Sequence, residues 1–210
     1  MKVLLVNGSC NKNGCTNRAL EEIASTLNSQ DIETEIIQLG NKPYRDCIGC
    51  GECRKGLNKC VFNDDIVNEI IEKAKDADGF IFGSPVYYAH PSGRLLTVMD
   101  RVFYAGGKNF EFKPAAAIVS ARRAGTTASL DAITKHFTIN NMPVVSAKYW
   151  AMVHGGQNKP EHVEQDEEGL QTMRTIGRNM AWILKCIKAG KDSGLERPEL
   201  EEKIWTNFIR

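Results

Sequence analysis

Short apolar stretches alternate with amphipathic stretches along most of the chain, and this alternation restricts the possible folds more than any other feature. The apolar stretches, typical of buried strands, are 2–6, 32–39, 80–83, 115–119 and a last one that opens at 143–146. The stretches with helical spacing of apolar residues are 16–27, 64–74, 92–103, 126–137 and 167–187. Strands that alternate with helices form a parallel sheet covered on both faces. The sequence therefore predicts a doubly wound α/β fold with a five-stranded parallel sheet.

A chain of 210 residues is long enough for one well-buried core and short for two. Two segments exceed the minimal α/β pattern. They are a cysteine-rich loop at 40–62 and a C-terminal extension at 190–210, in which 198–209 is predicted as a terminal helix. Neither contains a repeat or a low-complexity linker, so residues 1–210 are predicted to form a single domain.

Charge and cysteine content exclude several classes of function. The 27 Lys and Arg balance 26 Asp and Glu, which argues against a nucleic-acid binder that relies on a basic face. No apolar run approaches the roughly 20 residues of a membrane helix, and the N-terminal apolar stretch is too short for an export signal. An odd number of cysteines, seven, argues against a secreted disulfide framework. We therefore expect a cytoplasmic protein that binds neither nucleic acid nor membrane.

The turn between the first strand and the first helix contains residues suited to a phosphate group. Its two glycines are separated by five residues rather than the four of a Walker A loop, and Cys15 stands where that loop has its lysine. Ser9, Thr16 and Asn17 place small polar side chains around a helix start, whose unpaired N–H groups favour an anion. The alternative is that Thr16 only caps the helix.

The turn after the third strand lies at the same edge of the predicted sheet. It contains Ser84, Pro85 and Val86, followed by Tyr87 and Tyr88. A turn rigidified by proline, with aromatic side chains, suits one side of a planar heterocycle. The alternative is that the two tyrosines only pack a loop.

Together the two turns resemble those of the flavodoxin-like NAD(P)H-dependent FMN reductases and their relatives, the iron–sulfur flavoproteins. The resemblance covers about residues 1–155 and implies a flavodoxin-like fold. It places the FMN phosphate at Ser9, Cys15, Thr16 and Asn17 and the flavin ring at 84–88. It also implies roles for Ser120 and Gly125 after the fourth strand. Many family members carry Arg or Lys in the phosphate turn, where this chain offers Lys12.

Arg122 follows the fourth strand at the same edge of the sheet. A cation there would stabilise reduced flavin or meet a nicotinamide phosphate. The alternative is that Arg122 and its neighbour Arg123 form a solvated basic pair.

The cysteine-rich loop contains the sharpest local pattern, with thiols at Cys47, Cys50, Cys53 and Cys60. Four thiolates suit a [4Fe–4S] cluster or a tetrahedral zinc ion. The pattern resembles the compact cysteine motif of the iron–sulfur flavoproteins, which implies a [4Fe–4S] cluster beside FMN. Zinc, reduced thiols and a disulfide remain alternatives.

These features predict an FMN-dependent oxidoreductase that passes electrons from NAD(P)H to a small acceptor such as a quinone, a nitro or azo compound, or a flavin. Because the flavin performs the redox chemistry, no catalytic side chain is assigned. One alternative is an electron carrier between a ferredoxin-like donor and FMN through a [4Fe–4S] cluster. Another is a non-catalytic redox-sensing module. The resemblance also implies a homodimer or homotetramer.

Overall fold

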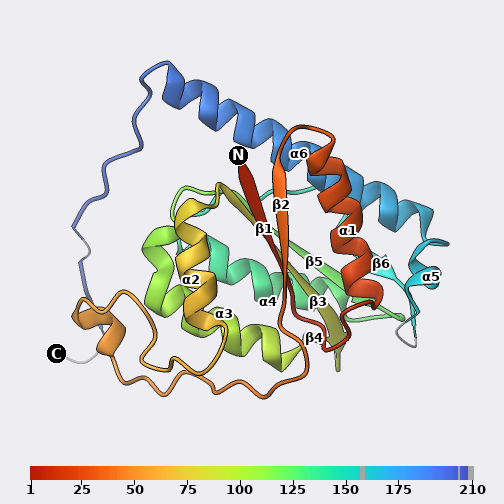
Figure 1. Cartoon of the computed structure of the whole chain (residues 1–210), viewed down its shortest axis with the longest axis horizontal. Helices are drawn as coiled ribbons and strands as arrows, with labels where there is room; N and C mark the ends of the chain where they lie inside the picture. The colour runs from red at the N-terminus through yellow and green to blue at the C-terminus, as the bar shows by residue number, and fades with distance from the viewer. Residues whose placement is uncertain (157–158, 203, 208–210) are drawn as a thin grey trace.

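A parallel sheet forms the centre of the computed structural model, which describes residues 1–156, 159–202 and 204–207. Its strands follow one another across the sheet in the order β2 (Glu33–Gln38), β1 (Lys2–Asn7), β3 (Gly79–Tyr87), β5 (Ala115–Ala121) and β6 (Met152–His154) (Figure 1). A sixth strand, β4 (His90–Pro91), pairs antiparallel with the end of β3. The predicted doubly wound fold is therefore confirmed, with six strands rather than five.

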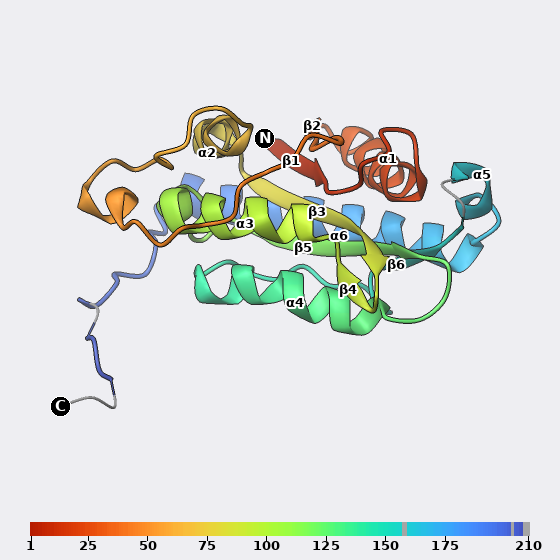
Figure 2. The same cartoon turned by 90° about the horizontal axis from the view of Figure 1, so that it is seen from below.

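Helices cover both faces of the sheet (Figures 1 and 2). Helices α1 (Cys15–Asn28) and α6 (Glu167–Asp192) pack against each other on one face. The opposite face carries α2 (Val67–Asp76), α3 (Gly93–Gly106) and α4 (Thr126–Ile139), each packed against the next. Short helices are η1 (Glu52–Lys55) in the cysteine-rich loop, η2 (Gly107–Asn109) and α5 (Pro160–Val163). No helix of the described ranges combines the length and apolar character needed to cross a membrane.

The three central strands are buried on both sides, as expected for a sheet enclosed between two helix layers. All side chains of 3–6 and 80–82 are fully buried, and β5 is buried along its whole length. This packing explains why these stretches are continuously apolar in the sequence rather than alternating.

The last predicted strand is only partly correct. Val144 makes a single bridge to Ala115, and the strand itself is β6, eight residues further on. Between them the chain leaves the sheet, exposing Tyr149 and Trp150, and returns where the Val119 amide donates to the Ala151 carbonyl at 3.0 Å. An edge strand can be interrupted in this way because only one neighbour pairs with it.

The predicted helix at 198–209 is wrong for the residues that the structure describes there, because 198–202 and 204–207 are not helical. Residues 208–209 lie outside the described ranges. The described residues 198–202 and 204–207 are exposed and bury no apolar face against the sheet. A helix of about twelve residues is marginal in water without such packing.

The contact between α1 and α6 contains a charged cluster centred on Glu22. Its carboxylate accepts hydrogen bonds from Arg18 at 2.7 Å and from Arg174 at 2.6 Å. Burial by itself raises the pKa of Glu22, but the two guanidinium groups outweigh that effect and hold the pKa below its usual value of 4.5.

Replacing Glu22 with glutamine is expected to lower the free energy of unfolding by about 1–2 kcal/mol near pH 7. Because the folded-state pKa of Glu22 is depressed, its stabilising effect is complete above the unfolded pKa and disappears as the pH falls through the folded value. The difference between Glu22→Gln and the parent chain should therefore shrink below pH 4.5, which denaturant titrations at several pH values would measure. In the control Glu72→Gln, which removes an exposed pairing with Lys75, the loss should stay below about 0.5 kcal/mol. A difference for Glu22→Gln that does not change down to about pH 3 would contradict this assignment.

Candidate functional site

The carboxyl ends of β1, β3 and β5 bring the predicted turns together at one edge of the sheet. The Gly8 amide donates to the Gly83 carbonyl at 2.8 Å, which joins the first turn to the third strand. Pro85 lies opposite Ser120 in the register of β3 and β5. The two predicted turns and the end of β5 therefore form one surface, here called the flavin edge. Because the strand order reverses next to β1, this is also where ligands bind in doubly wound sheets.

Helix α1 begins with backbone N–H groups directed at this edge. Gly14 is its first capping residue and supplies no side-chain cap, and the first backbone bond of the helix runs from the Arg18 amide to the Gly14 carbonyl. The preceding N–H groups of the first turn have no partner within the helix. They lie at the positive end of the helix dipole, which suits a phosphate dianion.

Thr16 is not the helix cap, so the alternative interpretation of this residue is wrong. It lies inside the helix, buried, with its hydroxyl 2.8 Å from the hydroxyl of Ser120. This hydrogen bond joins the phosphate turn to the end of β5, where two of the predicted FMN residues therefore meet.

The rest of the turn is held in shape by its own polar side chains. The Ser9 amide donates to the Asn7 side-chain oxygen at 3.0 Å, and the Asn11 amide donates to the Ser9 hydroxyl at 3.1 Å. Asn7 in turn donates to the Asn17 side chain at 3.3 Å. Ser9 and Asn17 thus stabilise the turn, while Lys12 is exposed at its tip.

Cys15 is a buried thiol. Burial raises its pKa, and its thiol donates to the Lys159 carbonyl at 3.3 Å. At this position the group that a phosphate could contact is the backbone N–H of Cys15 rather than its sulfur.

Replacing Thr16 with valine is expected to weaken FMN binding about tenfold, because it removes one hydroxyl and leaves that of Ser120 without its partner. Fluorescence titration of the apoprotein with FMN would measure the change. Ser25→Ala, an exposed position on the same helix, should bind FMN like the parent chain. Equal affinities for Thr16→Val and Ser25→Ala would contradict the predicted phosphate site.

A tight hairpin after β3 forms the other side of the flavin edge. Its two central residues, Tyr88 and Ala89, both have positive φ, at 51° and 61°. This is the conformation of a type I′ turn, which normally contains Asn and Gly. Backbone held in the left-handed region by residues other than Gly costs free energy and often marks a binding site.

The side chains of this hairpin are placed differently. Tyr88 is fully exposed and Tyr87 is half exposed. The pKa of Tyr87 is raised by partial burial and by the Cys10 thiol beside its hydroxyl. The Ser84 hydroxyl is fully buried and accepts from the Ser92 amide at 2.9 Å, so it holds the turn rather than facing a ligand. Arg122 is exposed at the same edge.

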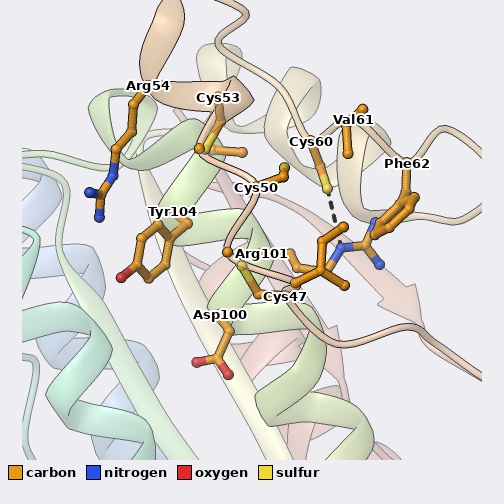
Figure 3. Close-up of a pocket in the computed structure, with 14 residues that line it drawn as sticks. Cys47, Cys50, Cys53, Arg54, Cys60, Val61, Phe62, Asp100, Arg101 and Tyr104 are labelled. Carbon is orange, nitrogen blue, oxygen red and sulfur yellow. Dashed lines mark hydrogen bonds between the residues drawn. The ribbon is translucent and has the colours of Figure 1, made fainter.

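The four cysteines of the predicted metal site line a hollow, here called the cysteine cavity, with a volume of about 490 Å3 (Figure 3). All seven cysteines lie within the described ranges and are free thiols. Gly49 and Gly51, both with positive φ, allow the loop to turn between the first three. Helix α3 forms the other wall with Asp100, Arg101, Tyr104 and Ala105. In the part of the chain that the structure describes, no three Cys, His, Asp or Glu side chains are arranged to hold a single metal ion.

The cysteine cavity and the flavin edge lie at different points along α3. Ser92, which caps α3, donates its hydroxyl to the Gly8 carbonyl at the flavin edge, whereas Arg101 lies at the cavity. Nine residues of helix separate them, or about 14 Å. Within one chain, then, the structure does not bring the two predicted sites into contact.

The α3 wall of the cysteine cavity, above all Arg101, was not predicted from the sequence. This residue is 1% exposed and pairs with the Asp65 carboxylate. The sequence pattern could have indicated that Arg101 is buried, because it lies at helical spacing between Val98 and Ala105 on the buried face of α3. A charged residue at such a position requires a buried partner.

A parallel sheet in this order, with a phosphate turn after β1 and an aromatic hairpin after β3, defines a flavodoxin-like FMN-binding protein. Residues 1–157 match the model of the NADPH-dependent FMN reductases. An iron–sulfur flavoprotein of Methanocaldococcus jannaschii is 34% identical over 197 residues, which cover 90% of this chain and all of the relative. That of Methanosarcina thermophila is 27% identical over 196 residues, 91% of this chain and all of the relative. A solved archaeal flavodoxin superimposes with a TM-score of 0.60 at 17% identity, over 88% of this chain and 99% of that one.

The chain belongs to the family of the NADPH-dependent FMN reductases and iron–sulfur flavoproteins. It is therefore an FMN-dependent oxidoreductase, as the two turns predicted.

Proposed function

We propose that this FMN oxidoreductase holds a [4Fe–4S] cluster on Cys47, Cys50, Cys53 and Cys60 and exchanges single electrons with a ferredoxin-like protein. The observation that carries the proposal is that all four thiols, unoxidised, line one cavity. The names of the full-length relatives, iron–sulfur flavoproteins, support the same assignment. When bound, FMN supplies two-electron chemistry and the cluster supplies one-electron exchange.

The size of the cysteine cavity suits a cluster better than a single zinc ion. A tetrahedral zinc site places four sulfurs about 2.3 Å from one ion, and so about 4 Å from each other. The described side chains form no such group. A four-iron cluster binds each thiolate to a different iron and is surrounded by its ligands at wider spacing. The cysteine cavity, with a volume of about 490 Å3, has room for a four-iron cluster.

The residues of the flavin edge would bind and orient FMN. The N–H groups that begin α1, with the Ser9, Thr16 and Asn17 side chains around them, would hold the phosphate. The hairpin of Pro85, Val86, Tyr87 and Tyr88 would lie along the ring, and the exposed Arg122 would supply a cation near it. Gly125 allows the hairpin to pack against α4.

A second candidate function is direct reduction of FMN by NAD(P)H, followed by reduction of a small acceptor. The open flavin edge favours it, because Tyr87, Tyr88 and Arg122 are exposed where a nicotinamide or an acceptor would approach. The name of the matching family supports this donor as well.

Protein purified without oxygen would distinguish these functions. Flavin absorbance together with about four irons and four sulfides per chain would support the cluster. Faster reduction by reduced ferredoxin than by NADH or NADPH would then support the electron carrier. Flavin without metal, reduced by a nicotinamide, would support the second function instead. Stoichiometric zinc, or a reversible disulfide without flavin, would support a redox-sensing module.

We also propose that the protein is a homodimer or homotetramer. Large apolar side chains are exposed at Tyr149, Trp150 and Trp182, the last two at 57% and 68%. Aromatic side chains of this kind are enriched at protein interfaces. Light scattering during size-exclusion chromatography would measure the mass, and a monomer at micromolar concentration would overturn the proposal.

A further inference from the structure

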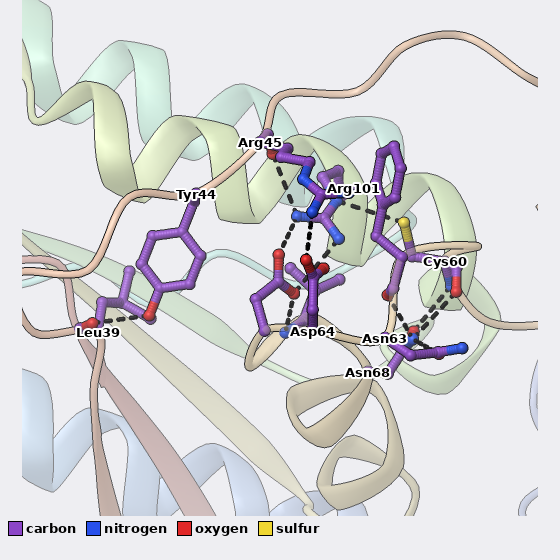
Figure 4. A network of polar contacts seen from close by, with 11 residues as sticks. Leu39, Tyr44, Arg45, Cys60, Asn63, Asp64, Asn68 and Arg101 are labelled. Atoms are coloured by element: carbon purple, nitrogen blue, oxygen red, sulfur yellow. Dashed lines mark hydrogen bonds and ion pairs between the residues drawn. The ribbon is translucent and has the colours of Figure 1, made fainter.

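The buried guanidinium of Arg101 joins segments of the cysteine-rich loop that are far apart in sequence (Figure 4). It lies on the inner face of α3 and is 1% exposed. Its Nη1 donates to the Arg45 carbonyl at 3.1 Å, just before the first cysteine of the loop. Both terminal nitrogens donate to the carboxylate of Asp65, which follows Cys60, the last cysteine of the loop. One side chain thus ties both ends of the loop to α3.

The remaining donor of Arg101 is directed at a thiol. Its Nε donates to the Cys60 sulfur at 3.3 Å (Figure 3). The Phe62 ring lies 5.2 Å from the guanidinium carbon and covers it. A sulfur that accepts one hydrogen bond can still bind a metal, and such bonds to ligand sulfurs are among the contacts that set a cluster's reduction potential.

Cys60 is also fixed through its backbone. Its amide donates to the Asn68 side-chain oxygen at 2.8 Å, and its carbonyl accepts from the Asn68 side-chain nitrogen at 3.0 Å. Cys47 and Cys50, in contrast, are exposed. Cys60 is therefore held by α2 and α3 before any metal is bound.

We propose that Arg101 is the positioning residue of the cluster site, holding Cys60 in place as the anchoring ligand and donating a hydrogen bond to its sulfur. This inference rests on the proposed function, since it concerns the retention and the potential of the cluster. Arginine suits the role because its planar fork donates in several directions at once, to the Arg45 carbonyl, Asp65 and Cys60. Lysine keeps the positive charge for Asp65 but is a point charge without that fork.

Arg101→Lys, Arg101→Gln and Arg178→Gln would test the role. Arg178 is the control, because it is an exposed arginine on α6, outside the cysteine cavity. Each protein is purified without oxygen and reconstituted with iron and sulfide. The readouts are FMN per chain, iron per chain, the rate of iron loss to a chelator, and the midpoint potential of the cluster.

Arg101→Lys is expected to keep FMN at the parent level and to lose iron about tenfold faster. Its potential should become more negative, because one hydrogen bond to a ligand sulfur is gone. Arg101→Gln should show larger changes in the same direction, and Arg178→Gln should match the parent chain.

Three results would overturn the proposal. If Arg101→Lys matches Arg178→Gln in iron loss and potential, Arg101 does not position the cluster, although the proposed function stands. If Arg101→Lys loses FMN as much as iron, Arg101 supports the whole fold rather than this site. If the parent chain itself retains no iron after reconstitution, the proposed function fails and this inference fails with it. Should Arg101→Gln not fold, the lysine variant decides.

Discussion

Cys50→Ala is expected to lose the iron–sulfur cluster while retaining FMN. In Cys50→Ala one iron of the proposed cluster loses its protein ligand, so the chain should hold well under half of the parent's iron. The flavin edge lies about 14 Å along α3 from the cavity, so FMN content should not change. Iron, sulfide and flavin analyses, together with the visible spectrum, would measure both effects. Electron transfer from reduced ferredoxin should fall at least tenfold under the proposed function.

The matched control is Cys186→Ala. Cys186 is an exposed thiol on α6, outside the cysteine cavity, so its removal should leave iron, flavin and rate as in the parent chain. An unchanged spectrum and unchanged iron content in Cys50→Ala would exclude the cluster from this loop.

Gly125→Ala is expected to lower the free energy of unfolding by about 2–3 kcal/mol. Two effects combine at this position, which caps α4. Gly125 has a φ of 96°, where an L side chain is strained, and an added Cβ would lie 2.4 Å from the Ala89 Cα. A backbone atom cannot rotate away as a side chain can, so the hairpin that includes Tyr88 must move. FMN affinity should therefore fall about tenfold as well.

Gly93→Ala provides the comparison. An added Cβ there meets no atom within 4 Å, and the residue begins a helix without positive φ. Its stability should be unchanged or higher by up to about 1 kcal/mol. Denaturant unfolding of the apoproteins and FMN titration would measure both quantities. If Gly125→Ala is as stable as Gly93→Ala, the packing of the hairpin on α4 is not required for the fold.

The fold could be predicted largely from local pattern, because each central strand is buried on both faces and each helix on one. Burial on both faces produces continuous apolar runs such as 115–119, and burial on one face produces the helical spacing of apolar residues seen at 92–103. The positions of the flavin turns followed, since parallel strands end at the same edge. At the sheet edge the pattern was weaker: the pairing of 143–146 shrank to one bridge, and the strand formed at Met152–His154.

The cysteine site also separates what the sequence determines from what only the tertiary structure determines. Cys47, Cys50, Cys53 and Cys60 are near neighbours in the chain, so the sequence alone determined that their thiols can share one site. Only the tertiary structure placed Arg101 against them, because its partners Arg45, Cys60 and Asp65 lie 36 to 56 residues away. Periodicity reports which face of a helix is buried. It does not report what the buried face meets, and that depends on how separate elements pack in space.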